Sequence, residues 1–531
     1  MENSIYKNPT HTKSWALLQE NYQKIKDVQI GQLFVDYSDR VSEFSVLWED
    51  FLLDFSKNNI TPETFNYLIS FAEEMNLAKE INAMFSGEKI NITEERAVLH
   101  TALRSLDNEV YFGGENIIPD VQLQKKKIKV LTDKVLSGEK KGATNKQFTD
   151  VVNIGIGGSD LGPKMVTTAL EEYRTHLKVH FVSNIDADFN ESVFKTLDPE
   201  TTLLIVVSKS FTTKETLSNA NRAKRWLVNV LGEEATTHHF LAVSANENAV
   251  VEFGIHPDNI FKMWDWVGGR FSLWSSVGLS ISLALGYDHF EVLCKGAEKM
   301  DQHFRSTSFD KNLPVVLALL NIWYTNFYSL ETRAIIPYKE SLSQLVPYLQ
   351  QSFMESNGKS VDKNGETIAY NTGNIIFGNT GVNSQHAFFQ LIHQGTITVP
   401  VDFIGFCKVN CNDYDLNSQL ISNMFAQSKA LAWGDKKENL FKNFEGNKPS
   451  NTILIDALTP ESLGKLIAMY EHQIFTEGVL LNINSFDQFG VELGKEISED
   501  ITKEMKDEFI GIKDKSTSSL ILHYLKQNRI L

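Results

Sequence analysis

The sequence predicts an α/β protein with two doubly wound parallel-sheet subdomains, a helical N-terminal region and a C-terminal helical arm. Residues 148–285 alternate short apolar segments with helical ones, as do the units that build a parallel sheet. A second region of the same alternation runs from residue 312 to about residue 497. The chain has 531 residues, of which 42% are hydrophobic and 22% charged, so each region can bury a core.

Apolar residues at helical spacing predict that residues 1–115 are mostly helical. The pattern is present in Trp15–Lys26, Glu43–Lys57, Pro62–Met75 and Glu94–Arg104. In the last of these segments His100 and Arg104 fall on one helical face, and we expect both to pack against the body of the protein.

The first α/β region contains five expected strands. They are Val151–Ile156, Val179–Val182, Leu203–Val207, Phe240–Ala242 and a short one near Ile260–Met263. Ligands of doubly wound sheets bind beyond the carboxyl ends of the strands, near the switch in strand order. The residues that follow each strand are therefore the candidates for a ligand site.

The first strand runs into a glycine turn, GGSD at residues 157–160, and a helix is expected over Met165–Tyr173. Free N–H groups in such a turn and the dipole of the helix attract an anion. The dinucleotide fingerprint is absent, because Asp160 stands where its third glycine belongs. Taken alone, a turn of this kind is more often a tight strand–helix connection that binds nothing.

A second strand end carries SKSFTT at residues 208–213, ahead of a helix over Lys214–Val230. One hydroxyl serves to cap a helix. Four hydroxyls and Lys209 instead match a phosphate monoester, which has three acceptor oxygens and roughly −1.5 to −2 charge. GVELGK at residues 490–495 is one residue short of a P-loop and lacks the following Ser or Thr. We therefore expect a small phosphorylated metabolite and not a nucleoside triphosphate.

The segment DWVGGRFS at residues 265–272 places Arg270 directly after two glycines. A glycine pair ahead of an arginine indicates close approach of the backbone to a ligand. A surface loop with a structural ion pair fits the same pattern equally well.

The second α/β region begins with an apolar helix over Leu313–Tyr328. Its expected strands are Ala334–Pro337, Ile375–Phe377, Thr396–Ile404 and Thr452–Asp456, and its further helices are Asn383–Gln394, Leu416–Ala432 and Ser462–Phe475. His386 and His393 lie seven residues apart on one face of the first of these helices. A terminal helix over Thr517–Gln527 is expected to dock on the body or on a partner subunit.

Composition excludes several classes of function. The net charge of −16 argues against nucleic-acid and anionic-membrane binding. The N-terminal residues lack the pattern of a signal peptide, and the longest apolar run, Leu313–Leu330, is interrupted by polar residues. The three cysteines have no spacing typical of a disulfide framework or a metal site. We therefore expect a cytoplasmic protein without metal or cofactor.

Four motifs taken together resemble the glucose-6-phosphate isomerase (phosphoglucose isomerase) family. They are IGIGGSDLGP (154–163), DWVGGRFSLWSSVGL (265–279), MESNGK (354–359) and GVELGK (490–495), with QHAFFQLIHQGT (385–396) and ERAVLHTALR (95–104) in addition. The resemblance spans roughly residues 90–525. It implies two sugar-isomerase (SIS-type) subdomains, a homodimer, no metal, and interconversion of glucose 6-phosphate and fructose 6-phosphate. The expected parts are a helical region over 1–115, SIS-type subdomains over 116–290 and 291–500, and a helical arm over 501–531.

The resemblance also implies roles for individual residues. The substrate and phosphate positions of the family fall on Gly158, Ser159, Ser208, Lys209, Ser210, Thr212, Thr213, Gln351 and Gln488. Glu355 matches the base that moves a proton between C2 and C1, and Arg270 matches the cation beside the enediolate. His386 and Lys495 match the pair that opens the sugar ring, whereas His393 is expected to be structural.

The residue types suit this chemistry. A carboxylate within hydrogen-bond reach of the C2 proton can act as the base, and a fixed guanidinium stabilises the enediolate without reorganisation. Histidine suits proton transfer during ring opening near neutral pH. Two alternatives remain open at this point: a non-catalytic sugar-phosphate sensor, and an isomerase that acts mainly on mannose 6-phosphate. Phe353 and Asn379 depart from the family pattern close to Glu355 and His386.

Overall fold

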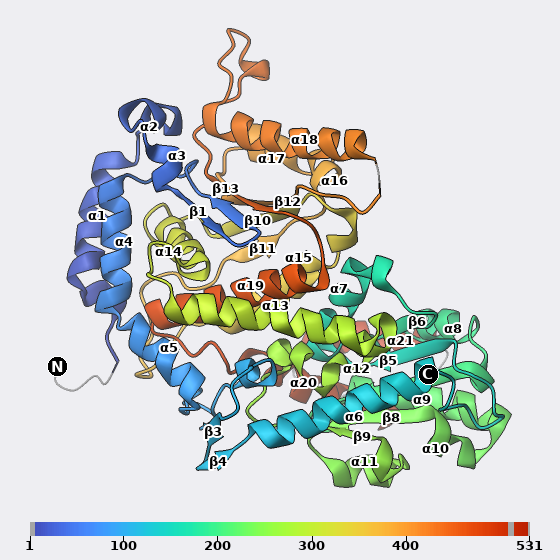
Figure 1. Cartoon of the computed structure of the whole chain (residues 1–531). Helices are drawn as coiled ribbons and strands as arrows, with labels where there is room; N and C mark the ends of the chain where they lie inside the picture. The colour runs from blue at the N-terminus through green and yellow to red at the C-terminus, as the bar shows by residue number, and fades with distance from the viewer. Residues whose placement is uncertain (1–5, 412, 508–513, 529–531) are drawn as a thin grey trace. The chain divides into compact units, whose positions relative to one another are not determined.

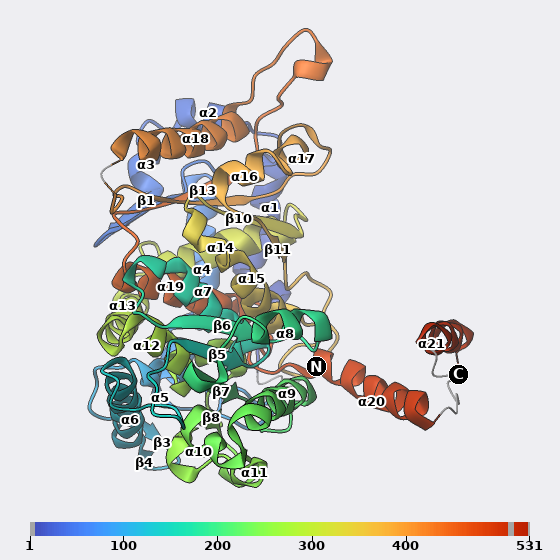
Figure 2. The ribbon, with the colours of Figure 1, turned by 90° about the vertical axis from the view of Figure 1, so that its right-hand side faces the viewer.

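The computed structural model describes residues 6–411, 413–507 and 514–528. Two compact units make up the chain, Met1–Ser485 and Phe486–Leu531. The described part of the first unit holds two large sheets, which Figures 1 and 2 show from two directions, and a small two-stranded one. The α/β class expected from the sequence is confirmed.

One sheet has five parallel strands in the order β6-β5-β7-β8-β9. These are β5 (Asp150–Ile154), β6 (Lys178–Val182), β7 (Thr202–Val207), β8 (Phe240–Ser244) and β9 (Ile260–Lys262). All six residues of β7 are buried, as expected for a strand covered on both faces. The order reverses between β5 and β7, so the loops that follow these two strands flank the switch point where such sheets bind ligands.

Helices cover both faces of this sheet. They are α6 (Ile118–Leu136), α7 (Leu161–Ala169), α8 (Ala187–Phe194), α9 (Lys214–Leu231), α10 (Thr236–His239), α11 (Glu247–Phe253) and α12 (Leu279–Leu285). Ala220, Ala223 and Leu227 of α9 join the buried apolar cluster that contains Ile154 and Val206 of the sheet. This packing fixes the start of α9 beside the end of β7.

The other sheet has six strands in the order β1-β2-β13-β12-β10-β11. They are β1 (Ser45–Trp48), β2 (Phe51–Asp54), β10 (Thr332–Pro337), β11 (Ile375–Phe377), β12 (Val401–Phe406) and β13 (Ser450–Ile455). The last four are parallel, whereas β1 and β2 form a hairpin that adds to β13 in antiparallel orientation. Helices α16 (Gly381–Gln385), α17 (Phe389–Gln394) and α18 (Tyr414–Trp433) lie on one side of this sheet, and α14 (Leu313–Asn326) lies on the other (Figure 2).

The hairpin corrects the helix expected over Glu43–Lys57. Phe51 and Leu53 are buried at every second position, and Leu53 pairs with Ile453 of β13. Glu49 has a φ of 48°, which makes the reversal between β1 and β2. The buried apolar residues of this short segment recur at every second position, as in a strand. The sequence analysis wrongly interpreted them as the face of a helix.

The helix expected over Glu94–Arg104 is also wrong. Only His100–Leu103 forms a helical turn, η2. Upstream of it Arg96 pairs with Asn91 as an isolated bridge, and Leu99 N donates to Trp266 O at 3.1 Å. These tertiary bonds replace the helical ones, although His100 and Arg104 are buried as expected.

Long helices fill the space between the sheets. The most buried are α13 (Tyr287–Ser306) and α19 (Pro460–Leu480), which run side by side (Figure 1), and α14. The remaining helices of this unit are α1 (Lys13–Ile25), α2 (Ile30–Asp36), α3 (Arg40–Glu43), α4 (Pro62–Glu74), α5 (Leu77–Ser86) and α15 (Leu345–Gln350), with a small hairpin of β3 (Tyr111–Phe112) and β4 (Glu115–Asn116). Every residue of α19 except Glu461 is buried, so its charged side chains must find partners inside the protein.

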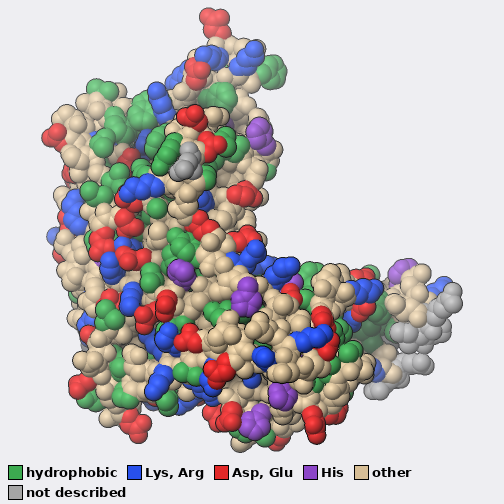
Figure 3. Space-filling model, turned by 45° about the vertical axis from the view of Figure 1, so that its right-hand side comes forward, with side chains coloured by type: hydrophobic (Ala, Val, Ile, Leu, Met, Phe, Trp, Pro, Cys, Tyr) green, Lys and Arg blue, Asp and Glu red, His purple; other side chains and the backbone are tan. Residues whose placement is uncertain are grey.

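The second unit contains α20 (Glu492–Asp507) and α21 (Lys515–Gln527). Leu493 and Ile497 of α20 are exposed. Nowhere in the described part of the chain is a helix both long and apolar enough to span a bilayer. On the face of the molecule in Figure 3, acidic and basic side chains are interspersed.

Candidate active site

Two glycine turns meet beside the end of β5. Gly157–Ser159 forms a short 3-10 turn, η3, and Gly157 has a φ of 62°. A Cβ atom added to Gly158 would lie 1.9 Å from Gly269 O, in the turn that carries Arg270. Glycine is therefore required at position 158, because only its missing side chain lets the two turns approach each other. A Cβ on Gly157 would lie 3.0 Å from Gln351 Nε2, so Gln351 borders the same turn.

The hydroxyl-rich segment follows β7 at the other side of the switch point. Buried Ser208 supports the loop itself, since its Oγ accepts from Phe211 N at 3.1 Å. Ser210 and Thr212 are exposed and share a hydrogen bond of 2.7 Å between their hydroxyls. Thr213 caps α9 by position but makes no side-chain capping bond. Capping of α9 therefore does not use all the hydroxyls of this segment, and those of Ser210 and Thr212 can bind a ligand.

Lys209 ties this loop to the arginine turn. Its ammonium donates to Asp265 O at 2.8 Å and to Val267 O at 3.1 Å. Burial lowers the pKa of Lys209, and the nearby positive charge of Arg96 lowers it further. Asp265, whose Oδ1 lies 3.8 Å from the Lys209 ammonium, and Glu94, which pairs with Arg96 at 3.4 Å, offset part of this positive charge.

Arg96 was missed by the sequence analysis. It precedes Leu99, whose N–H bonds to Trp266 O between the two carbonyl groups that hold Lys209. Its proximity to Lys209 depends on this contact between distant segments, for which the sequence offers no signal beyond the motif ERAVLHTALR.

Arg270 is 3% exposed, so the alternative of a surface loop is wrong. Its Nε donates to Ser356 Oγ at 2.6 Å and its Nη2 to Ser485 O at 2.5 Å. Its Nη1 lies 3.9 Å from Glu355 Oε2. Bonds on both sides hold the guanidinium in one orientation beside the carboxylate of Glu355.

Glu355 ends a π-helical turn, η11 (Gln351–Glu355), that directly continues α15. Such turns are frequent at functional sites. Its side chain is 17% exposed, and Oε2 is buried with no hydrogen-bond partner among the described residues. A carboxylate oxygen that is positioned but not bonded remains available to accept a proton from a substrate.

A buried network behind η11 holds this segment in place. Asn357 Nδ2 donates to Glu477 Oε2 at 3.1 Å, and Ser485 Oγ donates to Asn357 Oδ1 at 2.7 Å. Because Ser485 O also accepts from Arg270, the network links Glu477 of α19 to the arginine. Burial raises the pKa of Glu477 to about 7. The sequence analysis did not single out these three positions.

Two histidines of the motif at residues 385–396 belong to the segment of α16 and α17. His386 is exposed at the end of α16, where the helix expected over Asn383–Gln394 divides into α16 and α17. Within the described chain, no hydrogen bond or ion pair joins His386 to Glu355. His393 bonds to Gln427 Oε1 at 2.7 Å, which agrees with a structural role.

Gln488 and Lys495 belong to the second unit. Gln488 precedes the short turn η13 (Phe489–Val491), and Lys495 lies in the first turn of α20. In the described residues no cluster of three or more His, Cys, Asp or Glu side chains is arranged to hold a metal ion.

The two departures from the family pattern have local explanations. Phe353 is 3% exposed and packs edge-on against Tyr470, with the Arg333 guanidinium 5.3 Å from its ring centre. Its side chain is thus part of the core behind η11. Asn379 accepts a hydrogen bond from the residue that follows it. Thr380 N donates to Asn379 Oδ1 at 2.8 Å, just before α16.

The fold and the site define an α/β protein whose glycine turns, hydroxyls, buried arginine and carboxylate gather at the ends of parallel strands, as suits a small anionic substrate. Residues 54–521 match the model of the phosphoglucose isomerase family. The chain belongs to this family, and the resemblance noted in the sequence is confirmed.

Known relatives agree over nearly the whole chain. The chain is 52% identical to the glucose-6-phosphate isomerase of Christiangramia forsetii, and the match covers 98% of this chain and 99% of the relative. The crystal structure of a glucose-6-phosphate isomerase from Chlamydia trachomatis superimposes with a TM-score of 0.88 at 32% identity, over 98% of this chain and 100% of that one. A hypothetical protein from Thermus thermophilus shares the fold, with a TM-score of 0.66 at 24% identity over 84% of this chain and 98% of its own.

Proposed function

We propose that the protein is a glucose-6-phosphate isomerase, which interconverts D-glucose 6-phosphate and D-fructose 6-phosphate in glycolysis and gluconeogenesis. The observation that carries this proposal is the pair of Arg270 and Glu355. A buried, fixed guanidinium lies 3.9 Å from a carboxylate oxygen that has no hydrogen-bond partner among the described residues. Transfer of a carbonyl group between C1 and C2 needs such a base and such a cation at one place.

The phosphate of the substrate binds at the switch point of the five-stranded sheet. Ser210 and Thr212 donate their hydroxyls, and Lys209 supplies positive charge. Gly158, Ser159, Ser208, Thr213 and Gln351 shape or border this site. The phosphate takes no part in the reaction, but its binding places the reacting carbons beside Glu355.

Glu355 removes the proton from C2 of the open-chain aldose and returns it to C1 of the enediolate, on the same face. Arg270 stabilises the negative charge that develops on the oxygens of C1 and C2. Because Ser356 and Ser485 already hold the guanidinium, little reorganisation accompanies the reaction.

His386 and Lys495 transfer protons to and from O5 and O1 when the ring opens, and Gln488 contacts the sugar. These roles rest on the family motifs QHAFFQLIHQGT and GVELGK. Histidine can exchange a proton near neutral pH, as this step requires.

The protein acts in the cytoplasm as a homodimer. The exposed apolar residues Leu493 and Ile497 of α20 support association, because a second copy would remove them from water. A sedimentation measurement that found only monomer at micromolar concentration would contradict this part of the proposal.

The function is tested by supplying purified protein with fructose 6-phosphate in the presence of a chelator. Formation of glucose 6-phosphate is followed with a coupled dehydrogenase, and mannose 6-phosphate is assayed in parallel. We expect turnover without added metal and a higher rate for the glucose epimer. Binding of fructose 6-phosphate without turnover would refute the proposal and identify a sensor.

Removal of the exposed hydroxyls of Ser210 and Thr212 is expected to weaken substrate binding. The double substitution Ser210→Ala/Thr212→Ala should raise KM roughly 10²- to 10⁴-fold with a smaller change in kcat, because each lost hydrogen bond to a charged phosphate costs about 1.5–3 kcal/mol. The matched control is Ser192→Ala/Thr196→Ala, at Ser192 of α8 and at Thr196 just after its end, whose hydroxyls bond to carbonyl groups of that helix. A double variant with the KM of the wild type would show that the phosphate binds elsewhere.

A further inference from the structure

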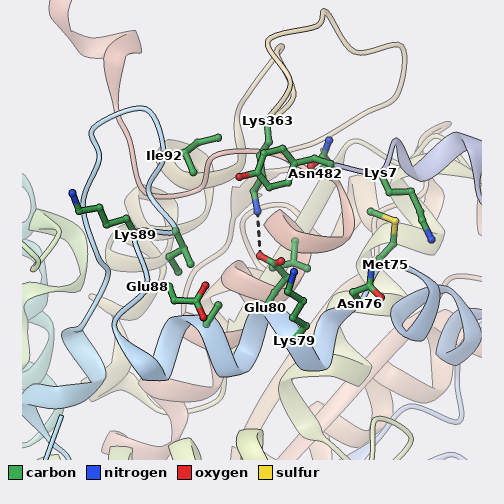
Figure 4. A pocket seen from close by; sticks show the side chains of 14 residues that line it. Lys7, Met75, Asn76, Lys79, Glu80, Glu88, Lys89, Ile92, Lys363 and Asn482 are labelled. Carbon is green, nitrogen blue, oxygen red and sulfur yellow. Dashed lines mark ion pairs between the residues drawn. The ribbon is translucent and has the colours of Figure 1, made fainter. Parts of the chain in front are cut away.

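A cavity lies within the first unit, on segments other than those that form the candidate active site. Its volume is about 270 Å³. The walls come from α5, the loop that follows it, the end of α19 and the residues around Lys363 (Figure 4). Neither the family motifs nor the proposed reaction uses any of these residues.

Lys363 enters the cavity from its loop, and Glu80 extends toward it from α5 (Figure 4). The Lys363 side chain is only 10% exposed. Its nearest acidic partner among the described residues is Glu80 Oε2, at 3.6 Å, which is longer than a hydrogen bond. Burial lowers the pKa of Lys363 even though Glu80 opposes the shift. The ammonium also lies 5.5 Å from the centre of the Tyr6 ring, so its contacts among the described residues are this ring and the Glu80 carboxylate, and it has donors left for a ligand.

The backbone on either side keeps Lys363 in this position. Its N–H donates to Asn482 O at 2.9 Å, and Asn482 Nδ2 donates to Asp362 at 3.2 Å. Asn364 bonds to both the N–H and the carbonyl group of Tyr6, at 3.2 and 3.0 Å. These hydrogen bonds fix the backbone on both sides of Lys363, so its ammonium group stays in the cavity.

Charge and polarity around the cavity select the ligand. Lys7, Lys79 and Lys89 also line it, whereas its acidic residues are Glu80 and Glu88. Positive charge thus predominates locally in a protein with a net charge of −16. A phosphate group can accept hydrogen bonds from lysines, and hydroxyl groups can donate to the two glutamates.

We propose that this cavity binds a small hydroxylated phosphate ester, with its phosphate against the ammonium groups of Lys363 and Lys79 and its hydroxyls toward Glu80. The volume of about 270 Å³ admits a short-chain ester. The site is separate from the one that binds the isomerase substrate.

Calorimetric titration with glycerol 3-phosphate tests the site, because this ester has no carbonyl group and cannot be isomerised. The full chain with Ser210→Ala/Thr212→Ala serves as the background, so that the active site contributes little. We expect one site per chain with a dissociation constant in the millimolar range. Lys363→Met should weaken binding by about tenfold or more, whereas Lys126→Met, at an exposed position of α6, should not change it.

Inorganic phosphate in the same titration separates a phosphate site from an ester site. We expect it to bind more weakly than the ester, because it cannot donate alcohol hydroxyls to Glu80. Equal affinity for glycerol 3-phosphate and inorganic phosphate would refute the preference for an ester and indicate a site for phosphate alone. Equal affinity of Lys363→Met and its background would refute the site. If Lys363→Met does not fold, Lys79→Met should still weaken binding about threefold or more, and unchanged affinity in that variant would refute the site.

Discussion

Glu355→Gln is expected to reduce kcat by roughly 10²- to 10⁴-fold, with little change in KM. The amide has the shape of the carboxylate and can keep its place in η11. It cannot accept the C2 proton, because it has no basic oxygen near neutral pH. The coupled assay with fructose 6-phosphate measures this loss, and thermal unfolding checks that the variant is folded.

Glu366→Gln is the matched control, since Glu366 is an exposed residue of the loop that follows the same segment. We expect its kcat to stay within about twofold of the wild type. If Glu355→Gln retained activity within about tenfold of this control, the isomerase reaction would stand but Glu355 would not be its base.

Arg270→Ala is expected to lower kcat by about 10²- to 10³-fold, because the enediolate loses its preorganised cation. Stability should fall as well, since Ser356 Oγ and Ser485 O lose a buried donor. Arg270→Lys keeps the charge but not the planar donors that reach both partners, so it should recover only part of the activity.

Added guanidinium separates the two effects of Arg270→Ala. Restored turnover in millimolar guanidinium would show that the missing charge limits the reaction. Arg225→Ala, at an exposed position of α9, should have wild-type kinetics with and without guanidinium. An Arg270→Ala variant that is folded and nearly as active as the wild type would contradict the proposed role.

Strands β5, β7 and β8 of the first sheet could be predicted because nearly all of their residues are buried and most are apolar. Leu203–Val207 was expected, and β7 is Thr202–Val207. When both faces of a strand are buried, nearly every residue in it is apolar, so each residue contributes to the prediction of the strand. Short segments that take their partner from elsewhere have no such signal, and the hairpin of β1 and β2 was missed for this reason.

The residues of the candidate site also fall into two groups, those that a local sequence pattern indicates and those that it does not. The glycine turn, the hydroxyl segment and Arg270 could be proposed from the sequence because each is a local pattern at a strand end, and their roles stay predictions. Arg96, Asn357, Glu477 and Ser485 could not be found, because each acts through a contact between segments far apart in the chain. The roles assigned to His386 and Lys495 stay predictions, as do the subdomain limits.

The most direct test of the central claim is isomerisation in deuterium oxide. If Glu355 carries the proton between C2 and C1, the captured proton can exchange with solvent while the enediolate exists. We predict that proton NMR will show deuterium at C2 of glucose 6-phosphate in a measurable fraction of turnovers, and none above background with Glu355→Gln. Equilibration of fructose 6-phosphate and glucose 6-phosphate by the wild type over many turnovers without any deuterium in either sugar would contradict the account.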